Sequence, residues 1–167
     1  DDENVKIFER DFLAKHLQMG LIDKDTPFEL VAELKYDGIS VEADVTDRIL
    51  SARSRGDANN DIAADLTPIL GGYKFPYAAP IPENEAFGMK FEAIITHINL
   101  DRMAKLRDKS YKNSRNGIIG LFGSSDAYDY RDLITLVPLA TSIEGIDRVT
   151  EIEFLNKYYN SGEYLRY

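Results

Sequence analysis

Cysteine is absent from this 167-residue sequence, and histidine occurs only twice. Without thiols the chain has no disulfide, no thiolate zinc site and no cysteine nucleophile, and two histidines leave little room for a metal cluster. No apolar run reaches the roughly 18 to 20 residues that a membrane-spanning helix needs, and the acidic N-terminus does not resemble a signal peptide. We therefore expect one soluble, cytoplasmic domain that has no membrane partner.

Basic residues are in the minority, because 20 Lys and Arg stand against 29 Asp and Glu, for a formal net charge of −9. This balance argues against a protein whose whole surface binds nucleic-acid phosphates, because neutralising those phosphates requires clustered Lys and Arg. The sign reverses locally between residues 102 and 115, where six basic residues accompany one acid. We interpret most of these basic residues as a solvated helix face and loop.

Hydrophobic periodicity predicts an α+β fold. The predicted strands cluster in hairpins instead of alternating singly with helices, which favours mostly antiparallel sheets with flanking helices over a doubly wound parallel sheet. Predicted helices cover residues 2–19, a short segment from 60 or 61 that Pro68 ends, a segment that opens at 99 or 101, 114–121 and 149–159. Predicted strands cover residues 28–36, 39–45, 49–55, 87–96 and 133–139.

Ionisable side chains occupy alternate positions in the segment Glu33-Leu34-Lys35-Tyr36-Asp37-Gly38. On a strand, Glu33, Lys35 and Asp37 would project from one face, while Leu34 and Tyr36 would anchor the other face in the core. A lysine between two carboxylates is normally held as a cation, and it must lose its proton before it can attack as a nucleophile. From spacing alone, a solvated charged strand face is the preferred interpretation.

The same segment also matches a known signature, because Lys35-Tyr36-Asp37-Gly38 fits the Lys-x-Asp-Gly motif of the covalent nucleotidyltransferases. Further segments resemble motifs of NAD-dependent DNA ligases in the same order, namely Ser54-Arg55-Gly56-Asp57, Asp61-Ile62-Ala63-Ala64-Asp65-Leu66, Phe91-Glu92-Ala93-Ile94 and Asn113-Ser114-Arg115-Asn116-Gly117-Ile118-Ile119-Gly120. Over nearly its whole length the chain is therefore similar to the adenylation domain of that family, a nucleotidyltransferase core.

This resemblance implies that Lys35 attacks the α-phosphorus of NAD, displaces nicotinamide mononucleotide and carries AMP through a phosphoramide bond. AMP would then pass to the 5′-phosphate of nicked double-stranded DNA, with Mg²⁺ as a cofactor. Asp37 would support the catalytic lysine, and no residue is assigned to a resident metal. By matching position the nucleotide would contact four side chains, with Glu33 at the adenine, Glu92 at the ribose, and Arg55 and Arg115 near the phosphates. We expect the protein to act as a monomer.

Several positions depart from the family pattern. Lys90-Phe91 precedes Glu92 where the family has Arg-Gly, and Gly123 stands where the family has a second arginine. Residues 133–140 are mostly aliphatic, where the family places an aromatic side chain against the adenine. The last motifs of the family would lie beyond Tyr167, so we expect a partial domain truncated at its C-terminus, and the isolated chain is expected to bind adenylate without completing ligation.

Two alternatives stay open. An ATP-dependent DNA or RNA ligase would share the lysine motif, since the domain that discriminates NAD is not visible here. A non-catalytic module that keeps a ligase-like fold and binds nucleic acid or a protein partner would explain the missing late motifs.

Overall fold

The computed structural model describes residues 2–23, 31–55, 63–75, 86–159 and 164–166. By its internal contacts the chain divides into two units, one of Asp1–Glu33 with Tyr164–Tyr167 and one of Leu34–Glu163. The described helices are α1 (Asp2–Gln18), α2 (Thr67–Leu70), α3 (His97–Arg107), α4 (Ser114–Phe122), the 3₁₀ helix η1 (Ala127–Leu133) and α5 (Arg148–Tyr159). The described strands are β1 (Val31–Glu33), β2 (Ile39–Val45), β3 (Ile49–Ser54), β4 (Phe87–Ile94), β5 (Thr135–Thr141) and β6 (Tyr164–Arg166).

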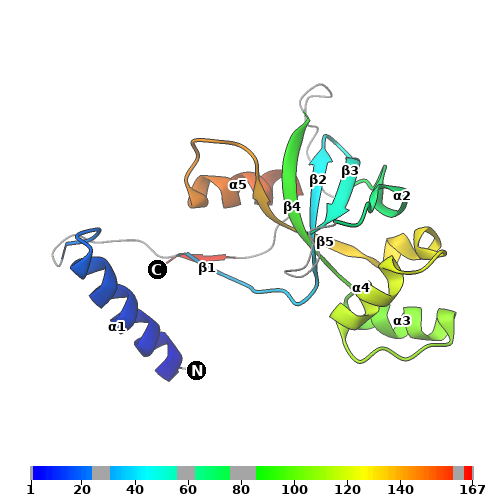
Figure 1. The fold of residues 1–167 in the computed structure, drawn as a ribbon, viewed down its shortest axis with the longest axis horizontal. Coiled ribbons are helices and arrows are strands. Elements are labelled where there is room, and N and C mark those ends of the chain that lie inside the picture. Colours follow the sequence, from blue (N-terminus) through cyan, green and yellow to red (C-terminus); the bar gives the residue numbers. More distant parts are fainter. Residues whose placement is uncertain (1, 24–30, 56–62, 76–85, 160–163, 167) are drawn as a thin grey trace. The chain divides into compact units, whose positions relative to one another are not determined.

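These elements form an α+β fold (Figure 1) in which every described strand pair is antiparallel, as the sequence predicted. Helix α1 and the pair β1–β6 make up the smaller unit. The larger unit contains a four-stranded sheet in the order β3-β2-β4-β5. None of the helices in the described part of the chain is long and apolar enough to cross a membrane.

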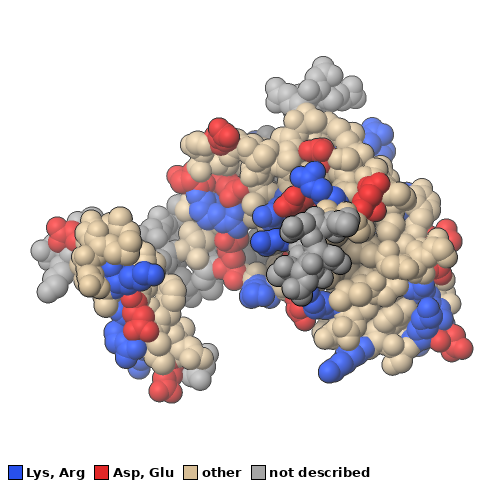
Figure 2. Space-filling view, viewed as in Figure 1, with Lys and Arg blue, Asp and Glu red and all other residues tan. Residues whose placement is uncertain are grey.

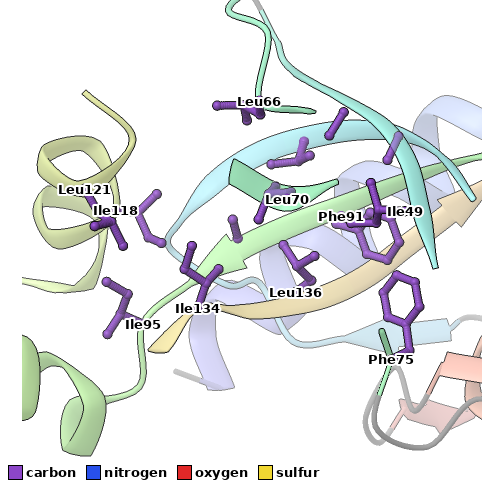
Figure 3. Packing of buried hydrophobic residues seen from close by; sticks show 14 of the residues in the cluster. Ile49, Leu66, Leu70, Phe75, Phe91, Ile95, Ile118, Leu121, Ile134 and Leu136 are labelled. Atoms are coloured by element: carbon purple, nitrogen blue, oxygen red, sulfur yellow. The ribbon is translucent and has the colours of Figure 1, made fainter. Parts of the chain in front are cut away.

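The core of the larger unit lies on one face of its sheet. In β2 the alternate residues Val41, Ala43 and Val45 are buried, which confirms the predicted period of two. The ring of Phe91, on β4, stacks on Phe75 with 5.3 Å between the ring centroids. Figure 3 shows this packing continuing to the apolar side chains of α2 and α4, which are Leu70, Ile118 and Leu121.

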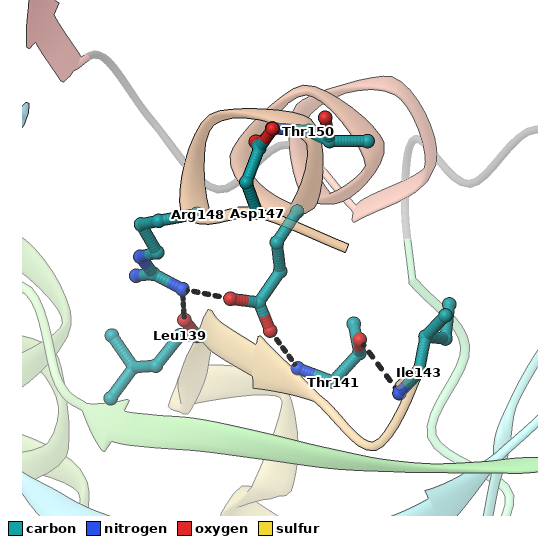
Figure 4. A network of polar contacts seen from close by, with 7 residues as sticks. Leu139, Thr141, Ile143, Asp147, Arg148 and Thr150 are labelled. Carbon is teal, nitrogen blue, oxygen red and sulfur yellow. Dashed lines mark hydrogen bonds and ion pairs between the residues drawn. The ribbon is translucent and has the colours of Figure 1, made fainter. Parts of the chain in front are cut away.

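Helix α5 covers the sheet edge at β5 through a polar network (Figure 4). The Glu151 carboxylate accepts a hydrogen bond of 2.6 Å from the Thr141 backbone N–H and one of 2.5 Å from Arg148. Arg148 also donates to the Leu139 carbonyl at 2.8 Å. Two backbone groups of the edge strand are thereby satisfied by side chains of α5, which protects the edge from pairing with another strand.

The prediction of a strand over residues 28–36 is wrong for half of its described part, residues 34–36. Only Val31–Glu33 forms a strand, and its partner is β6, so Asp37-Gly38 is not a hairpin turn between two paired strands. Leu34 was expected in the core, yet its side chain is 66 % exposed. The alternating pattern failed because residues 34–37, the first residues of the larger unit, have no described partner strand. Residues 28–30 lie outside the described part.

Two helix boundaries and one strand boundary also differ from the predictions. Pro68 lies at the start of α2 instead of ending a helix, since a proline is tolerated in the first turn, where its missing N–H has no helical partner. Helix α3 begins at His97 because the Thr96 hydroxyl caps it by accepting from the Asn99 N–H. Strand β5 begins two residues later than predicted, after the 3₁₀ turn of η1. The predicted helix start at residue 60 or 61 lies outside the described residues.

The other predicted elements are confirmed. Helix α1 ends before Gly20, which has a φ of 66° and was predicted to stop it. The predictions for β2, β3, β4, α4 and α5 agree with the structure to within about two residues, a usual disagreement at element ends. Strand β6 was not predicted at all.

Candidate functional site

Gly38 lies at the centre of the predicted site, immediately before β2. A Cβ atom added to this residue would lie 2.2 Å from the Ala93 carbonyl oxygen and 2.7 Å from the Ile94 Cγ2 atom. Glycine is therefore required by the close approach of this backbone to β4, and no other side chain fits without displacing the strand. The lysine-motif segment is thus fixed at one point against the C-terminal end of β4.

Two charged side chains bind the backbone of Gly38 from separate elements. The Gly38 N–H donates to Oε1 of Glu92 at 3.0 Å, and the Gly38 carbonyl accepts from Nη1 of Arg115 at 2.7 Å. Glu92 lies on β4 and is partly buried opposite Ser40 of β2. Arg115 lies in the first turn of α4, whose start is fixed by the Asn113 side chain accepting from the Asn116 N–H at 2.9 Å.

Asp37 lies beside the same arginine, because its Oδ1 atom is 3.8 Å from Nη1 of Arg115. The side chains of Arg115 and Asp37 are 51 % and 70 % exposed, so this ion pair contributes little to stability. Lys35 precedes Gly38 by three residues and has an exposed side chain, which makes no hydrogen bond or ion pair with the described residues. The structure therefore gathers Asp37, Glu92 and Arg115 around Gly38 and leaves the amine of Lys35 open to solvent.

The two remaining predicted site residues lie outside this group of contacts. Arg55 follows the end of β3 with an exposed side chain, and its backbone N–H donates to the Ser40 carbonyl at 3.2 Å. Because Ser40 pairs with Glu92, Arg55 is anchored at the same end of the sheet. Glu33 ends β1 and belongs to the smaller unit, so its expected role at the adenine stays a prediction.

The sheet face opposite the core carries charges of both signs. Arg53 of β3 binds Glu42 of β2 at 3.1 Å, and Glu42 pairs across the sheet with Lys90 of β4. These side chains line a shallow open depression together with Asp44 and Ser142. Figure 2 shows basic and acidic side chains mixed over the larger unit. This charged face can be predicted from the sequence, because its charged residues alternate with buried residues along the strands.

Within the described residues, no group of three or more His, Asp or Glu side chains could hold a metal ion. Mg²⁺ is usually bound through one or two carboxylates together with the phosphates of a substrate. Asp37 and Glu92 are the carboxylates that the site offers near Gly38.

A second arginine cluster, which sequence reasoning missed, lies where α3 meets the segment after α4. The Arg107 side chain is only 4 % exposed and binds Asp126 at 2.8 Å, Ser124 at 2.5 Å and the Tyr111 hydroxyl at 3.3 Å. Its guanidinium also lies over the ring of Tyr130, 5.3 Å from the centroid. The Ser124 hydroxyl donates to Asp126 and lowers the pKa of that carboxyl, and the charge of Arg107 lowers it further.

The other basic residues between 102 and 112, which are Arg102, Lys105, Lys109 and Lys112, are exposed. Arg107 therefore differs from its neighbours in being part of the protein's internal structure. The sequence contains no clear sign of this difference, because the partners Ser124 and Asp126 lie 17 and 19 residues away.

Comparison with known proteins gives a distant and partial match. A DNA ligase from Parabacteroides distasonis is 33 % identical to this chain over 107 residues, an alignment that covers 56 % of the chain. The chain spans only 15 % of the length of that ligase. No protein-family model matches the sequence. The similarity indicates a region related to DNA ligases.

Proposed function

We propose that this chain is the core of a ligase adenylation domain, in which Lys35 accepts AMP from NAD. The observation that carries the proposal is the meeting of three ligase-like segments at Gly38. Arg115 and Gly38 are 77 residues apart in sequence, yet their atoms lie within hydrogen-bonding distance. Asp37 and Glu92 join them there, so charged residues from three separate ligase-like segments converge on one glycine.

The proposed reaction begins with the unprotonated amine of Lys35. Its nitrogen attacks the α-phosphorus of NAD, a phosphoramide N–P bond forms, and the P–O bond to nicotinamide mononucleotide breaks. The electron pair of that bond leaves on the phosphate oxygen of the mononucleotide, and the proton of the amine passes to water. The exposure of Lys35 is compatible with this step, because an incoming nucleotide can reach the amine without a rearrangement of the core.

The neighbouring side chains would bind and orient the nucleotide. Glu92 would accept hydrogen bonds from the ribose, while Arg55 and Arg115 would stabilise charge on the phosphates. Bound Mg²⁺ would neutralise phosphate oxygens, with Asp37 or Glu92 as protein ligands. In this proposal a nicked duplex DNA finally receives the AMP, as the similarity to a DNA ligase suggests.

Measurement of the intact mass of the chain after incubation with Mg²⁺ and NAD, or with Mg²⁺ and ATP, tests the proposal. We expect a covalent adduct with the mass of AMP from NAD, located at Lys35 by peptide mapping. The variant Lys35→Ala should form no adduct and should unfold at the same temperature as the unaltered chain, because the side chain is exposed. Lys105→Ala removes an equally exposed lysine on α3 and should leave labelling unchanged.

The other outcomes separate the alternatives. An adduct formed from ATP and not from NAD would replace the proposed cofactor while leaving the role of Lys35 intact. Labelling that persists in Lys35→Ala would move the nucleophile to another residue. No adduct from either nucleotide would contradict the proposal and favour a module that binds without catalysis.

A further inference from the structure

We infer that Glu92 and Arg115 are positioning residues that clamp both backbone polar groups of Gly38 and thereby hold the Lys35–Gly38 segment in place. This role differs from the nucleotide contacts suggested for the same side chains. Its consequence for the reactivity of Lys35 rests on the proposed function. The clamp itself is a property of the nucleotide-free protein and can be measured alone.

The two hydrogen bonds of the clamp are the dominant contacts of these side chains. Nη1 of Arg115 is 2.7 Å from the Gly38 carbonyl oxygen but 3.8 Å from the nearest oxygen of Asp37. The carbonyl is therefore the primary partner, and the carboxylate adds a weaker electrostatic contact. Both bonds of the clamp involve an ionised side chain, which makes them stronger than bonds between neutral groups.

The surroundings give the clamp rigid supports. Glu92 projects from β4, which pairs on both sides with β2 and β5. Arg115 projects from α4, which buries Gly117, Ile118 and Leu121 against the core. Gly38 lies in contact distance of the β4 backbone, so the segment has little room to move while both bonds are made.

Clamping leaves both side chains able to contact a nucleotide. A guanidinium has five N–H donors and a carboxylate has two oxygens, and only one atom of each is used on Gly38. Half of the Arg115 side chain remains exposed.

Loss of a phosphate contact and loss of the clamp have different kinetic effects. Loss of binding to the ground state raises the apparent Kd of the nucleotide, while loss of alignment lowers the labelling rate at saturation.

Amide hydrogen exchange of Gly38, followed by NMR in the nucleotide-free chain, tests the clamp directly. We expect Glu92→Ala, which removes the acceptor of this amide, to speed its exchange by about tenfold or more, the ratio that corresponds to one lost hydrogen bond. Arg115→Ala removes the bond to the Gly38 carbonyl and should speed the same exchange by a smaller factor, because the segment is then held by one bond instead of two. Glu92→Gln keeps an acceptor oxygen and Arg115→Lys keeps a cationic donor, so both should restore part of the protection. Arg102→Ala removes an exposed arginine from α3 and serves as the matched control, with no change expected.

Single-turnover labelling with NAD supplies the functional readout. We expect Arg115→Ala to lower the saturating labelling rate of Lys35 by about tenfold or more, because misplacement by a fraction of an ångström already slows group transfer. The apparent Kd should change by a smaller factor, and Arg115→Lys should recover part of the rate. A uniform loss of stability would produce neither this division nor this rescue.

Each result decides the question. Unchanged Gly38 exchange in both alanine variants would overturn the clamp, and so would an equal effect of Arg102→Ala. Faster exchange with an unchanged labelling rate would show that the clamp does not position Lys35. If the unaltered chain takes up no AMP, the proposed function is wrong, and the exchange rates alone then decide whether Glu92 and Arg115 hold Gly38.

Discussion

Two arginines of this chain, Arg107 and Arg115, lie close together in sequence but differ sharply in surroundings. Arg107 is nearly buried and binds a carboxylate, a hydroxyl and a phenol while an aromatic ring covers it. Arg115 is half exposed and binds one backbone carbonyl and, more loosely, one carboxylate. The side chain of Arg107 is therefore enclosed by its protein partners, whereas Arg115 keeps donors that face solvent.

The difference separates a structural cluster from a candidate site. A buried charge must be fully paired, because an unpaired one costs several kcal/mol, and a group with all its partners inside the protein has no capacity for a ligand. An exposed charge beside a constrained backbone has that capacity. Burial and the number of free donors thus distinguish the two arginines, although both are single basic residues in the same basic stretch.

The largest effect is expected from Gly38→Ala, which would disturb the close approach of Gly38 to β4 at the candidate site. The new methyl group would overlap the Ala93 carbonyl oxygen, so β4 or the Lys35–Gly38 segment must shift, and we expect a loss of about 3 kcal/mol in the free energy of unfolding. Urea unfolding followed by circular dichroism measures this loss.

Gly123→Ala provides the matched control for Gly38→Ala. A Cβ atom at Gly123 would lie 3.5 Å from its nearest neighbour, the Ile119 carbonyl oxygen, and the φ of −82° suits any residue. We expect this change to be neutral or slightly stabilising. Equal losses in both variants would contradict the special role of the backbone at Gly38.

The comparison of the arginines is sharpened by Arg107→Ala and Arg115→Ala in the same unfolding assay. Arg107→Ala should cost about 2 kcal/mol, because it removes three hydrogen bonds from a buried position and leaves their partners with fewer contacts. Arg115→Ala should cost less than about 1 kcal/mol, since its side chain is half exposed. A larger loss of unfolding free energy for Arg115→Ala than for Arg107→Ala would contradict our view that Arg107 is structural and Arg115 belongs to the candidate site.

Much of the larger unit follows from local sequence patterns. The period of two in β2 and β4, the Ser114 start of α4 and the apolar spacing of α5 each reflect burial of one face, which a single sequence records. The grouping of Asp37, Glu92 and Arg115 was suggested by motif resemblance. No periodicity could have placed residues on a loop, a strand and a helix beside one another.

Two of the failures, at residues 34–37 and at Arg107, have a common physical cause, because both depended on long-range partners. Residues 34–37 alternate as a strand does, but a strand also needs a neighbour, and β1 finds its own in β6, at the other end of the sequence. Pro68 can end one helix or lie in the first turn of the next, and here it lies in the first turn of α2. Arg107 differs from Lys105 through Tyr111, Ser124 and Asp126, which all follow α3.

The pH dependence of unfolding offers a smaller effect that also separates the two regions. The pKa of Asp126 lies below its ordinary value of 3.8, first through the hydrogen bond from Ser124 and then through the charge of Arg107. A lowered pKa in the folded state stabilises the protein above the ordinary value, and this contribution is lost as the pH falls through the folded value. Asp126→Asn should therefore weaken the decline in stability below pH 3.8, as measured by urea midpoints across the acid range. Ser124→Ala should act in the same direction, and an acid decline unaltered in both variants would contradict the coupling.

The smallest effect is expected at the exposed pair Arg53–Glu42, which tests whether exposure alone explains the behaviour of Arg115. The two side chains are 62 % and 37 % exposed and bind each other at 3.1 Å across β2 and β3. A double-mutant cycle with Arg53→Gln and Glu42→Gln should give a coupling of about 0.5 kcal/mol or less, reduced further by added salt. Unlike Arg115, Arg53 has no carbonyl partner among its described contacts, so Arg53→Gln should leave Gly38 exchange unchanged while Arg115→Ala speeds it. If both changes speed that exchange equally, the charge of the sheet face, and not the bond to Gly38, holds the Lys35–Gly38 segment.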